Sequence, residues 1–238
     1  MFTQITFEGL VLAEKQAYRF IMKTHPIDFI LSGIFLSLIC SISLFMTAWG
    51  IVPYTRPLLQ DYHTLADLIF FLLFYGLISG FITRLLIKIY PLKPGEYTMD
   101  DHHFTYWKLL TMIQSFAEFC LHPITPMIAR PLVSRLFGAK LGHDVALAGV
   151  IECPYLVTVG DNTILGYNSA ISPNVSLNNK IIFGKIKIGH NVTIGVNSII
   201  LPDVEIGDGA QVGIGSVVVP GTKIPPGETW KGNPARPW

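Results

Sequence analysis

A six-residue period runs through the last hundred residues of the chain and constrains its fold more than any other feature. The period has a single slip, between Ile171 and Ile188. One repeat cannot bury its own apolar face, so such units are stable only when stacked on their neighbours. Fourteen of the fifteen recurring positions hold Leu, Ile or Val: Leu141, Leu147, Cys153, Val159, Leu165, Ile171, Leu177, Ile182, Ile188, Ile194, Ile200, Ile206, Val212, Val218 and Ile224.

This period predicts the geometry of a coil. Each unit is expected to be a very short strand followed by a corner, with its aliphatic side chain pointing into the coil. A small residue four positions later, such as Ser169 or Ser198, fits the corner, and Gly or Asn accepts the backbone angles there. Three units close one triangular coil, and stacked coils lie about 4.8 Å apart. Residues 141–228 supply about five coils.

The slip itself is predicted to be a small loop over residues 176–185, and loops on regular coils tend to carry function.

The first half of the chain has the character of a membrane protein. Only 14% of all residues are charged, against about 25% in typical soluble domains. Residues 29–52 contain no charged side chain, and residues 68–87 contain only Arg84. Because about 20 apolar residues span a bilayer as a helix, residues 28–90 are predicted to form a transmembrane helical hairpin. A buried core helix is the alternative for the second stretch.

The distribution of Lys and Arg predicts an orientation for this hairpin. Its outer flanks are rich in basic residues, whereas the connector between the spans has only Arg56. By the positive-inside rule, we expect a multi-pass protein of the inner or cytoplasmic membrane, with both termini and the repeats on the cytoplasmic side. Residues 1–27 are predicted to be an interfacial helix, and residues 91–138 a membrane-proximal helical linker in the membrane plane. Packing of the linker against the spans is the alternative.

Charge and cysteine content argue against several functional classes. With 17 Lys and Arg against 16 Asp and Glu, no basic stripe indicates a nucleic-acid partner. The three cysteines match no zinc or redox spacing, and no metal is expected. The predicted spans lack the buried ionisable groups of transport pathways, so a channel or transporter is disfavoured.

Residues 139–238 resemble the hexapeptide-repeat acyltransferases. The resemblance rests on the repeat together with the tail Trp230-Lys-Gly-Asn-Pro-Ala-Arg236, which is similar to the Gly-Asn-Pro-Ala element of many acetyl-CoA-dependent members. It implies a left-handed parallel β-helix, an acetyl-CoA or other acyl-CoA donor, and a homotrimer with active sites in clefts between neighbouring coils.

A narrower resemblance reaches upstream to residue 90. It is to the membrane-associated acyltransferase-like domain that ends some nonribosomal peptide synthetases. The residues that carry it are Pro94-Gly-Glu-Tyr97, Tyr106-Trp107, residues 136–142, and Glu152-Cys-Pro-Tyr-Leu-Val157.

Acyl transfer needs a base to deprotonate the acceptor and donors to hold the oxyanion. The family resemblance implies a histidine base, and two histidines lie in the repeats. His190 with Asn191 is the first candidate, and His143 with Asp144 is the second. Counting eight repeat units between the two histidines predicts that they lie on different corners. Glu152 is a further candidate because it lies in the narrower match. A solvated surface position is the alternative for each of these residues.

The donor and the acceptor have separate candidate residues. For acyl-CoA, the resemblance implies the late coils, with Gly213, Gly215 and Ser216 along the pantetheine arm. Lys231, Asn233 and Arg236 of the tail are the candidates for the nucleotide end, where the cations could meet phosphates. The acceptor candidates are His102 and His103, on the expected membrane surface, and Asn178 and Asn179 in the predicted loop. Many members of the family carry a histidine in this loop.

The sequence therefore predicts a membrane α-helical part followed by an all-β repeat domain at residues 139–238. Its expected function is acylation of a hydroxyl or amine on a membrane-proximal acceptor, such as a lipid-linked sugar or glycan precursor. A non-catalytic membrane scaffold built on the same coils is the alternative. A γ-type carbonic anhydrase needs three histidine ligands for zinc and is disfavoured, because only two histidines lie in the coils.

Overall fold

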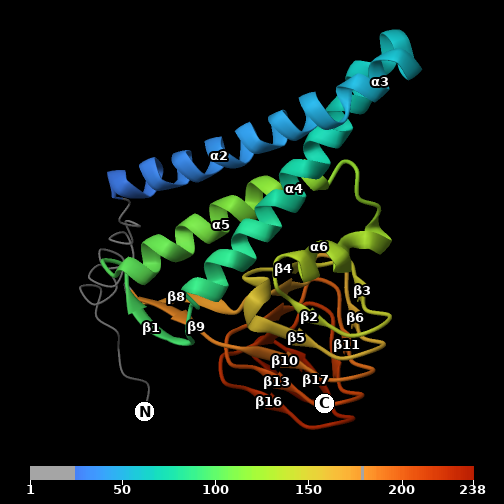
Figure 1. Ribbon diagram of the computed structural model, residues 1–238. Coiled ribbons are helices and arrows are strands. Elements are labelled where there is room, and N and C mark those ends of the chain that lie inside the picture. Colours follow the sequence, from blue (N-terminus) through green and yellow to red (C-terminus); the bar gives the residue numbers. More distant parts are fainter. Residues whose placement is uncertain (1–24, 178–179) are drawn as a thin grey trace, which may run out of the picture.

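The computed structural model describes residues 25–177 and 180–238. Its first part is helical, and Figure 1 shows α4 crossing α2 and α5 above the stacked strands. The predicted interfacial helix over residues 1–27 lies outside the described residues, apart from its last three positions. The helices of the hairpin are α2 (Pro26–Gly50), α3 (Val52–Leu59), the short 3-10 helix η1 (Gln60–Tyr62) and α4 (His63–Ile89).

Two helical segments, Pro26–Gly50 and Val52–Ile89, are long and apolar enough to cross a membrane, judged by length and composition. These segments contain most of the residues of the two predicted spans. The connector between the spans is also helical, since it includes α3 and η1. The outer surface of α2 exposes large apolar side chains such as Phe29, Ile34 and Phe45. Within residues 25–177 and 180–238, the rest of the chain leaves more than half of each of these side chains exposed.

The next segment packs against the hairpin. It contains β1 (Gly95–Thr98), α5 (His102–Leu121), the 3-10 helix η2 (Met127–Ala129) and α6 (Arg130–Leu136). Leu109 and Ile113 of α5 are buried with Ile39 of α2 and Tyr75 of α4. α5 therefore packs against the predicted spans, which was the alternative to a helix in the membrane plane. The linker is helical over α5 and α6, and it also contains β1, a strand that pairs with a later hairpin.

Two glycines of α4 set how closely this layer packs. A Cβ on Gly76 would lie 2.4 Å from the side chain of Leu121, and one on Gly80 would lie 2.3 Å from that of Leu136. The ends of α5 and α6 therefore lie directly against α4. Lys108 of α5 also pairs with Asp28 at the start of α2.

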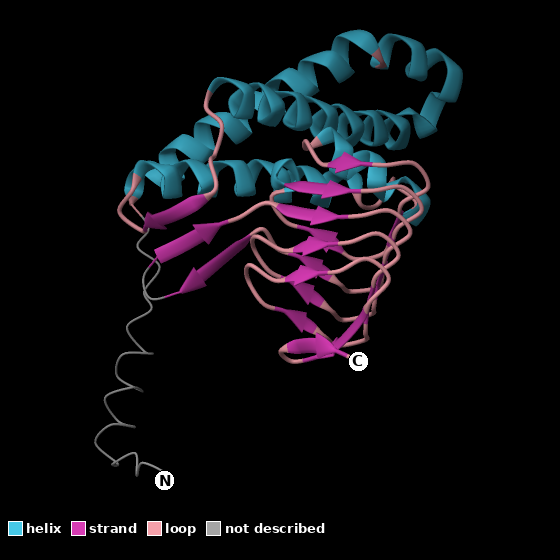
Figure 2. Cartoon of the chain, turned by 90° about the horizontal axis from the view of Figure 1, so that it is seen from below, coloured by secondary structure: helices cyan, strands magenta, loops and turns pink. Residues whose placement is uncertain are grey.

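The repeats form a parallel β-helix with three faces, as predicted. The coils stack away from the helices, and the C-terminus lies at the far end (Figures 1 and 2). Three sheets define the faces, and their strands are parallel except for the last pair, β17 with β18, which is antiparallel. Sheet 1 contains β2 (Lys140–Leu141), β5 (Val157–Val159), β10 (Ile186–Ile188), β13 (Glu205–Ile206) and β16 (Lys223–Ile224). Sheet 2 contains β3 (Ala146–Leu147), β6 (Ile164–Leu165), β11 (Thr193–Ile194), β14 (Gln211–Val212), β17 (Thr229–Gly232) and β18 (Ala235–Pro237). Sheet 3 contains β4 (Val150–Ile151), β7 (Ala170–Ile171), β12 (Ile199–Ile200) and β15 (Val217–Val218).

The recurring aliphatic residues fill the interior, and the strand register aligns them in columns. In sheet 1, for example, Leu141 pairs with Val159, which pairs with Ile188. The five strands of that sheet correspond to five coils. Each additional coil buries three more aliphatic side chains, at about 1.5–3 kcal/mol for each of them.

The interior position predicted for Cys153 is wrong. Ile151, not Cys153, pairs with Ile171 in sheet 3. The preceding corner is shortened at Gly149, where a Cβ would lie 2.3 Å from the carbonyl oxygen of Ser169. Cys153 instead faces the helices, where Trp107 Nε1 donates a hydrogen bond to its Sγ at 3.2 Å. Burial raises the pKa of the Cys153 thiol to about 11, so it is no nucleophile at neutral pH.

The slip is larger than predicted and is not an irregular loop. The chain leaves the coil as the antiparallel hairpin β8 (Asn174–Leu177) and β9 (Lys180–Phe183), and β9 pairs with β1. Leu177 and Ile182 therefore do not belong to the interior columns. The hairpin is held because Ile181 and Phe183 are buried against the helical segment. Asn178 and Asn179 lie outside the described residues.

The outward faces of the sheets differ in chemistry. Sheet 1 carries charged side chains, and Glu205 pairs with Lys187 and Lys223. Sheet 3 presents only apolar side chains at its outward strand positions: Val150, Ala170, Ile199 and Val217.

Candidate functional site

The two coil histidines lie on the same corner, the one between sheets 1 and 2. The prediction of different corners is wrong because it treated the slip as a small shift. The register advances by eighteen residues from Leu141 to Val159 (159 − 141 = 18) but by twenty-nine to Ile188 (188 − 159 = 29). The hairpin thus adds eleven residues to this turn of the coil (29 − 18 = 11), and these must be left out when repeat units are counted. His143 and His190 are two coils apart, with Asp161 between them.

Backbone and side-chain hydrogen bonds link these residues along the corner. The His143 N–H donates to Asp161 Oδ1 at 2.6 Å, and the Asp161 N–H donates to His190 Nδ1 at 3.0 Å. The His190 N–H in turn donates to Asp208 Oδ1 at 2.8 Å. The hydrogen bond from the His143 N–H is the main cause that lowers the pKa of Asp161; desolvation opposes it, and the two imidazoles lower the pKa further. Asp161 is therefore ionised at neutral pH.

The tautomer of His190 follows from these contacts. When Nδ1 accepts the amide hydrogen bond, the proton of the neutral ring lies on Nε2. A base acting through Nε2 needs the other tautomer, and Asp161 Oδ2, at 3.2 Å from Nδ1, is a suitable acceptor for the Nδ1 proton. When the His190 ring takes up a proton from a substrate hydroxyl or amine, the Asp161 carboxylate at this corner can therefore pair with the resulting imidazolium.

Asn191 and Asp144 have a backbone explanation. Their φ angles are 54° and 53°, and Asn162, Asn168 and Asn197 take the same left-handed conformation at other corners. Asn and Asp tolerate this conformation better than other non-glycine residues. The residue types at 191 and 144 are thus accounted for without a chemical role.

Glu152 lies on a different corner, between sheets 3 and 1. Ser172 Oγ donates to its carboxylate at 2.5 Å and contacts the Asn174 carbonyl oxygen at 3.0 Å. Glu152 therefore lies at the base of the β8–β9 hairpin, on a different corner from His143 and His190.

The candidate donor residues gather at the corner between sheets 2 and 3, on the last two coils. Ser198 Oγ donates to the Gly213 carbonyl at 2.8 Å, and the Gly232 N–H donates to Ser216 Oγ at 3.1 Å. A Cβ on Gly213 would lie 2.7 Å from Lys231 Cβ. Lys231 therefore fills the space beside Gly213, whereas a Cβ on Gly215 would meet nothing within 4 Å, so the backbone at Gly215 is open to a long, narrow ligand.

The tail folds back as a hairpin that brings two cations together. Lys231 of β17 pairs in register with Arg236 of β18, and Asn233 lies in the turn between them. Lys231 Nζ is 3.2 Å from the centre of the Trp238 ring, a cation–π contact. Two adjacent cations suit a phosphate group. The donor candidates are thus together, but in one chain they lie on a different corner from the histidines.

His102 and His103 cluster at the start of α5, beside the end of α4. The Tyr90 hydroxyl is 2.9 Å from Nε2 of His102 and 2.7 Å from Nε2 of His103. Asp101, the N-cap of α5, accepts from the backbone N–H and Nδ1 of His103, and both contacts lower its pKa. Asp101 and the two imidazoles offer ligand atoms within 4.8 Å of one another and could hold a metal ion.

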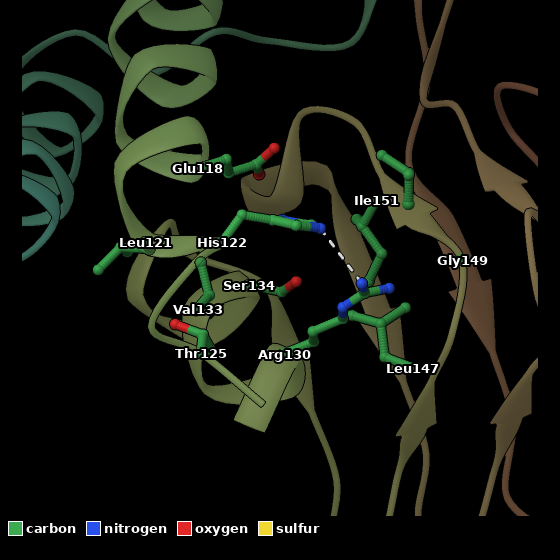
Figure 3. Close-up of a pocket in the computed structure, with 11 residues that line it drawn as sticks. Glu118, Leu121, His122, Thr125, Arg130, Val133, Ser134, Leu147, Gly149 and Ile151 are labelled. Atoms are coloured by element: carbon green, nitrogen blue, oxygen red, sulfur yellow. Dashed lines mark hydrogen bonds between the residues drawn. The ribbon is translucent and has the colours of Figure 1, made fainter. Parts of the chain in front are cut away.

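Sequence reasoning missed a pocket where α5 and α6 meet the first coil. It has a volume of about 80 Å³ and is lined by Glu118, His122, Arg130 and Ser134 among apolar side chains (Figure 3). Arg130 Nη2 lies 3.2 Å from His122 Nε2. The one available signal was the four-residue spacing of Glu118 and His122, which puts them on the same face of a helix.

Comparison with known proteins supports the repeat. The family described as "Hexapeptide repeat of succinyl-transferase" matches residues 185–220. A putative acetyltransferase of Bacillus subtilis (strain 168), YvoF, is 34% identical over 95 residues, which are 37% of this chain. The chain spans about half, 55%, of the length of that relative.

Solved structures with similar coils include two acetyltransferases. Galactoside acetyltransferase in complex with coenzyme A is 21% identical, with a TM-score of 0.48, over 66% of this chain and 89% of that one. The hexapeptide-repeat acetyltransferase of Vibrio cholerae is 22% identical, with a TM-score of 0.46, over 56% of this chain and 91% of that one. From the repeat match and the curated relative, the resemblance to the hexapeptide-repeat acyltransferases is confirmed.

Proposed function

We propose that this hexapeptide-repeat chain is a membrane-bound acyltransferase that takes its acyl group from acetyl-CoA. The acceptor is a hydroxyl or amine of a membrane-proximal molecule, such as a lipid-linked sugar or glycan precursor. The observation that carries the proposal is the corner formed by Gly213, Ser216 and Lys231 under the tail hairpin. It combines a backbone edge that is open at Gly215, within the matched hexapeptide repeats, with the two cations of the tail hairpin.

Acetyl-CoA matches this corner by charge and shape. The phosphates of its nucleotide would meet Lys231 and Arg236, with Asn233 in the adjoining turn. The pantetheine arm would follow the backbone past Gly215 and Ser216. Charge-assisted hydrogen bonds to phosphate are among the strongest that proteins make, so the nucleotide end supplies most of the affinity.

We propose His190 as the general base and His143 as the second candidate. Asp161 supports this choice, because its carboxylate can hold the imidazolium formed when His190 takes a proton. In the proposed step, the acceptor oxygen or nitrogen attacks the thioester carbonyl carbon, and its proton passes to His190. The carbon–sulfur bond then breaks, and the proton returns to the thiolate of coenzyme A. Backbone N–H groups of the neighbouring corner would hold the oxyanion.

In a homotrimer, the histidine corner of one copy could lie close to the corner of the next copy that carries the candidate donor residues. Sheet 3 supports association because its outward positions are apolar, and Val150 and Ile199 are 54% and 39% exposed. Contiguous exposed apolar surface marks an interaction site. In the proposed trimer of left-handed helices, His190 of one copy faces the donor corner of the next.

The membrane arrangement is also a proposal. α2 and α4 would cross the bilayer and leave the β-helix on the cytoplasmic side, where acetyl-CoA is available. Lys88 and Lys93 follow the second span and agree with this orientation. His102 and His103 would then lie near the membrane surface and could contact the acceptor.

The test is transfer of labelled acetyl from acetyl-CoA in membranes that contain the wild type or His190→Ala. We expect label in a lipid or glycan fraction with the wild type and at least a roughly 100-fold loss with the variant. A matched His143→Ala variant should retain transfer. Equal labelling by the wild type and His190→Ala would move the base elsewhere.

A non-catalytic scaffold is the second candidate, favoured by the separation of the histidines from the donor corner within one chain. It predicts that the purified protein binds no acetyl-CoA. A calorimetric titration of the wild type and of Lys231→Ala with Arg236→Ala decides between the two functions. Binding by the wild type that is lost in the double variant supports the enzyme.

A further inference from the structure

The pocket between α5, α6 and the first coil has a polar wall and an apolar floor. Glu118 and His122 reach into it from one face of α5, and Arg130 and Ser134 face them from α6 (Figure 3). Leu147 and Ile151 of the first coil form the floor. Within a small space, the pocket thus offers a carboxylate, an imidazole, a guanidinium and a hydroxyl. This mixture of donors and acceptors suits a ligand with several hydroxyl groups.

The pocket opens toward an apolar surface. An adjoining hollow shares Glu118 and His122, and its other wall is formed by Phe119 and Pro123. Phe119 is 77% exposed, and Ile128 on the neighbouring 3-10 helix is 89% exposed. Large exposed apolar side chains around a polar pocket are typical of a site that meets lipid. A ligand with a polar head and an apolar tail would fit both surfaces.

The pocket lies on the same edge of the β-helix as the donor corner. Its Gly149 belongs to the corner between sheets 2 and 3 on the first coil. Hydrogen bonds connect this corner from coil to coil: Asn168 N–H to Ala148 O, Asn197 N–H to Tyr167 O and Gly215 N–H to Val196 O. From the first coil to the fourth is three strand spacings, roughly 14 Å. A long, flexible thioester donor held at Lys231 can extend along this edge toward the pocket.

Charge favours a neutral head group over an anion. Arg130 and His122 alone would suit a phosphate, but Glu118 lines the same space and would repel it. Gln114 Nε2 donates to Glu118 Oε1 at 2.9 Å and fixes the carboxyl group. Burial raises the pKa of Glu118, against the smaller opposing effects of Gln114 and His122. A hydroxyl group can hydrogen-bond to this carboxyl group in either protonation state.

We propose that this pocket binds the hydroxylated head group of a lipid-attached acceptor, with Glu118, His122, Arg130 and Ser134 as its polar contacts. The inference rests on the proposed acyl transfer for its biological meaning, but binding itself can be tested without it. It adds an acceptor site on the same chain and edge as the donor corner.

The experiment uses the full chain in lipid nanodiscs and a photoreactive octyl glucoside with its diazirine next to the sugar. Peptide mapping by mass spectrometry locates the label. We expect it within residues 114–134 or 147–151, which line the pocket, and we expect unlabelled octyl glucoside to compete while octyl phosphate does not. Arg130→Ala should reduce labelling roughly tenfold, as expected for the loss of a hydrogen bond from a charged group.

Two further variants keep the test decisive if Arg130→Ala misfolds. Thr125→Trp fills the pocket from its loop wall without removing any polar contact, and it should also reduce labelling. Lys223→Ala, on the outward face of sheet 1, is the matched control and should label as the wild type does. Label outside residues 114–134 and 147–151, competition by octyl phosphate alone, or full labelling of Thr125→Trp would each overturn the proposal.

Calorimetric binding of acetyl-CoA, measured on the same samples, separates this inference from the proposed function. Pocket labelling without acetyl-CoA binding would refute the acyltransferase and leave the pocket standing as a glycolipid site. Acetyl-CoA binding with label elsewhere would refute the pocket alone. Because the donor corner is several coils away, Thr125→Trp should bind acetyl-CoA as the wild type does.

Discussion

At the scale of single residues, Asp161 has the most consequential position among the coil side chains. Its carboxylate and backbone N–H join His143 on the first coil to His190 on the third. The carboxylate is held by a backbone N–H as well as by the imidazoles, so it serves both the corner and the proposed base. Replacement of Asp161 should therefore affect both the stability of the corner and the activity of the proposed base.

Asp161→Ala should change how stability depends on pH. The folded-state pKa of Asp161 is lowered, mainly by the His143 N–H. Its stabilising contribution is thus present above the unfolded pKa, about 3.9, and is lost as the pH falls through the folded value. We expect the variant to be less stable than the wild type at pH 7, with the difference shrinking below about pH 4. Thermal unfolding of both proteins from pH 3 to 7 measures this, and a pH-independent difference would contradict it.

At the scale of elements, the β8–β9 hairpin connects the coils to the helices. Its strand β9 pairs with β1, which lies about eighty residues earlier in the chain, and the side chain of Phe183 is fully buried. The hairpin therefore fixes the helical part against the second and third coils.

Replacement of Phe183 by Ala should cost about 3–5 kcal/mol in the free energy of unfolding, because a fully buried aromatic side chain is removed. Leu177→Ala on the exposed strand of the same hairpin is the control and should change stability by less than about 0.5 kcal/mol. Denaturant unfolding in detergent compares the two. Similar losses for both would show that the hairpin is not packed as described.

The elements also explain what sequence could and could not predict. The coils were predictable because each inward side chain repeats at a fixed local spacing, as from Ile188 to Ile194 and Ile200. The pairing of β9 with β1 was not, because no local pattern links Ile181 to Tyr97. The donor corner followed from the tail motif. The pocket did not, because Glu118, Arg130 and Leu147 come from three elements that meet only after folding.

At the scale of the whole molecule, the three sheets of the β-helix present different surfaces. Sheet 1 is charged, whereas the outward positions of sheet 3 are apolar. We expect sheet 3 to be the contact between copies of the chain in the proposed trimer.

Ile199→Glu should therefore weaken self-association, since it puts a charge into the apolar contact without changing the coil interior. Thr158→Glu on sheet 1, between the outward-facing Lys140 and Lys187 of the neighbouring strands, is the matched control. Sedimentation in detergent should give trimers for the wild type and Thr158→Glu, and monomers for Ile199→Glu. A monomeric wild type would remove the trimer from the proposal.

Because the coils are equally spaced, the length of the β-helix is fixed by the number of its coils. The helical layer fixes one end of the stack, and the tail hairpin of β17 and β18, which we propose binds phosphate, closes the other. In the proposed arrangement, the distance from the membrane to the acyl donor is therefore set by the number of coils between them, in steps of about 4.8 Å. Evolution can lengthen or shorten that distance by whole turns of eighteen residues and leave both ends unchanged. A relative with one coil more would thus suit an acyl carrier with a longer arm, or an acceptor that protrudes less from the bilayer.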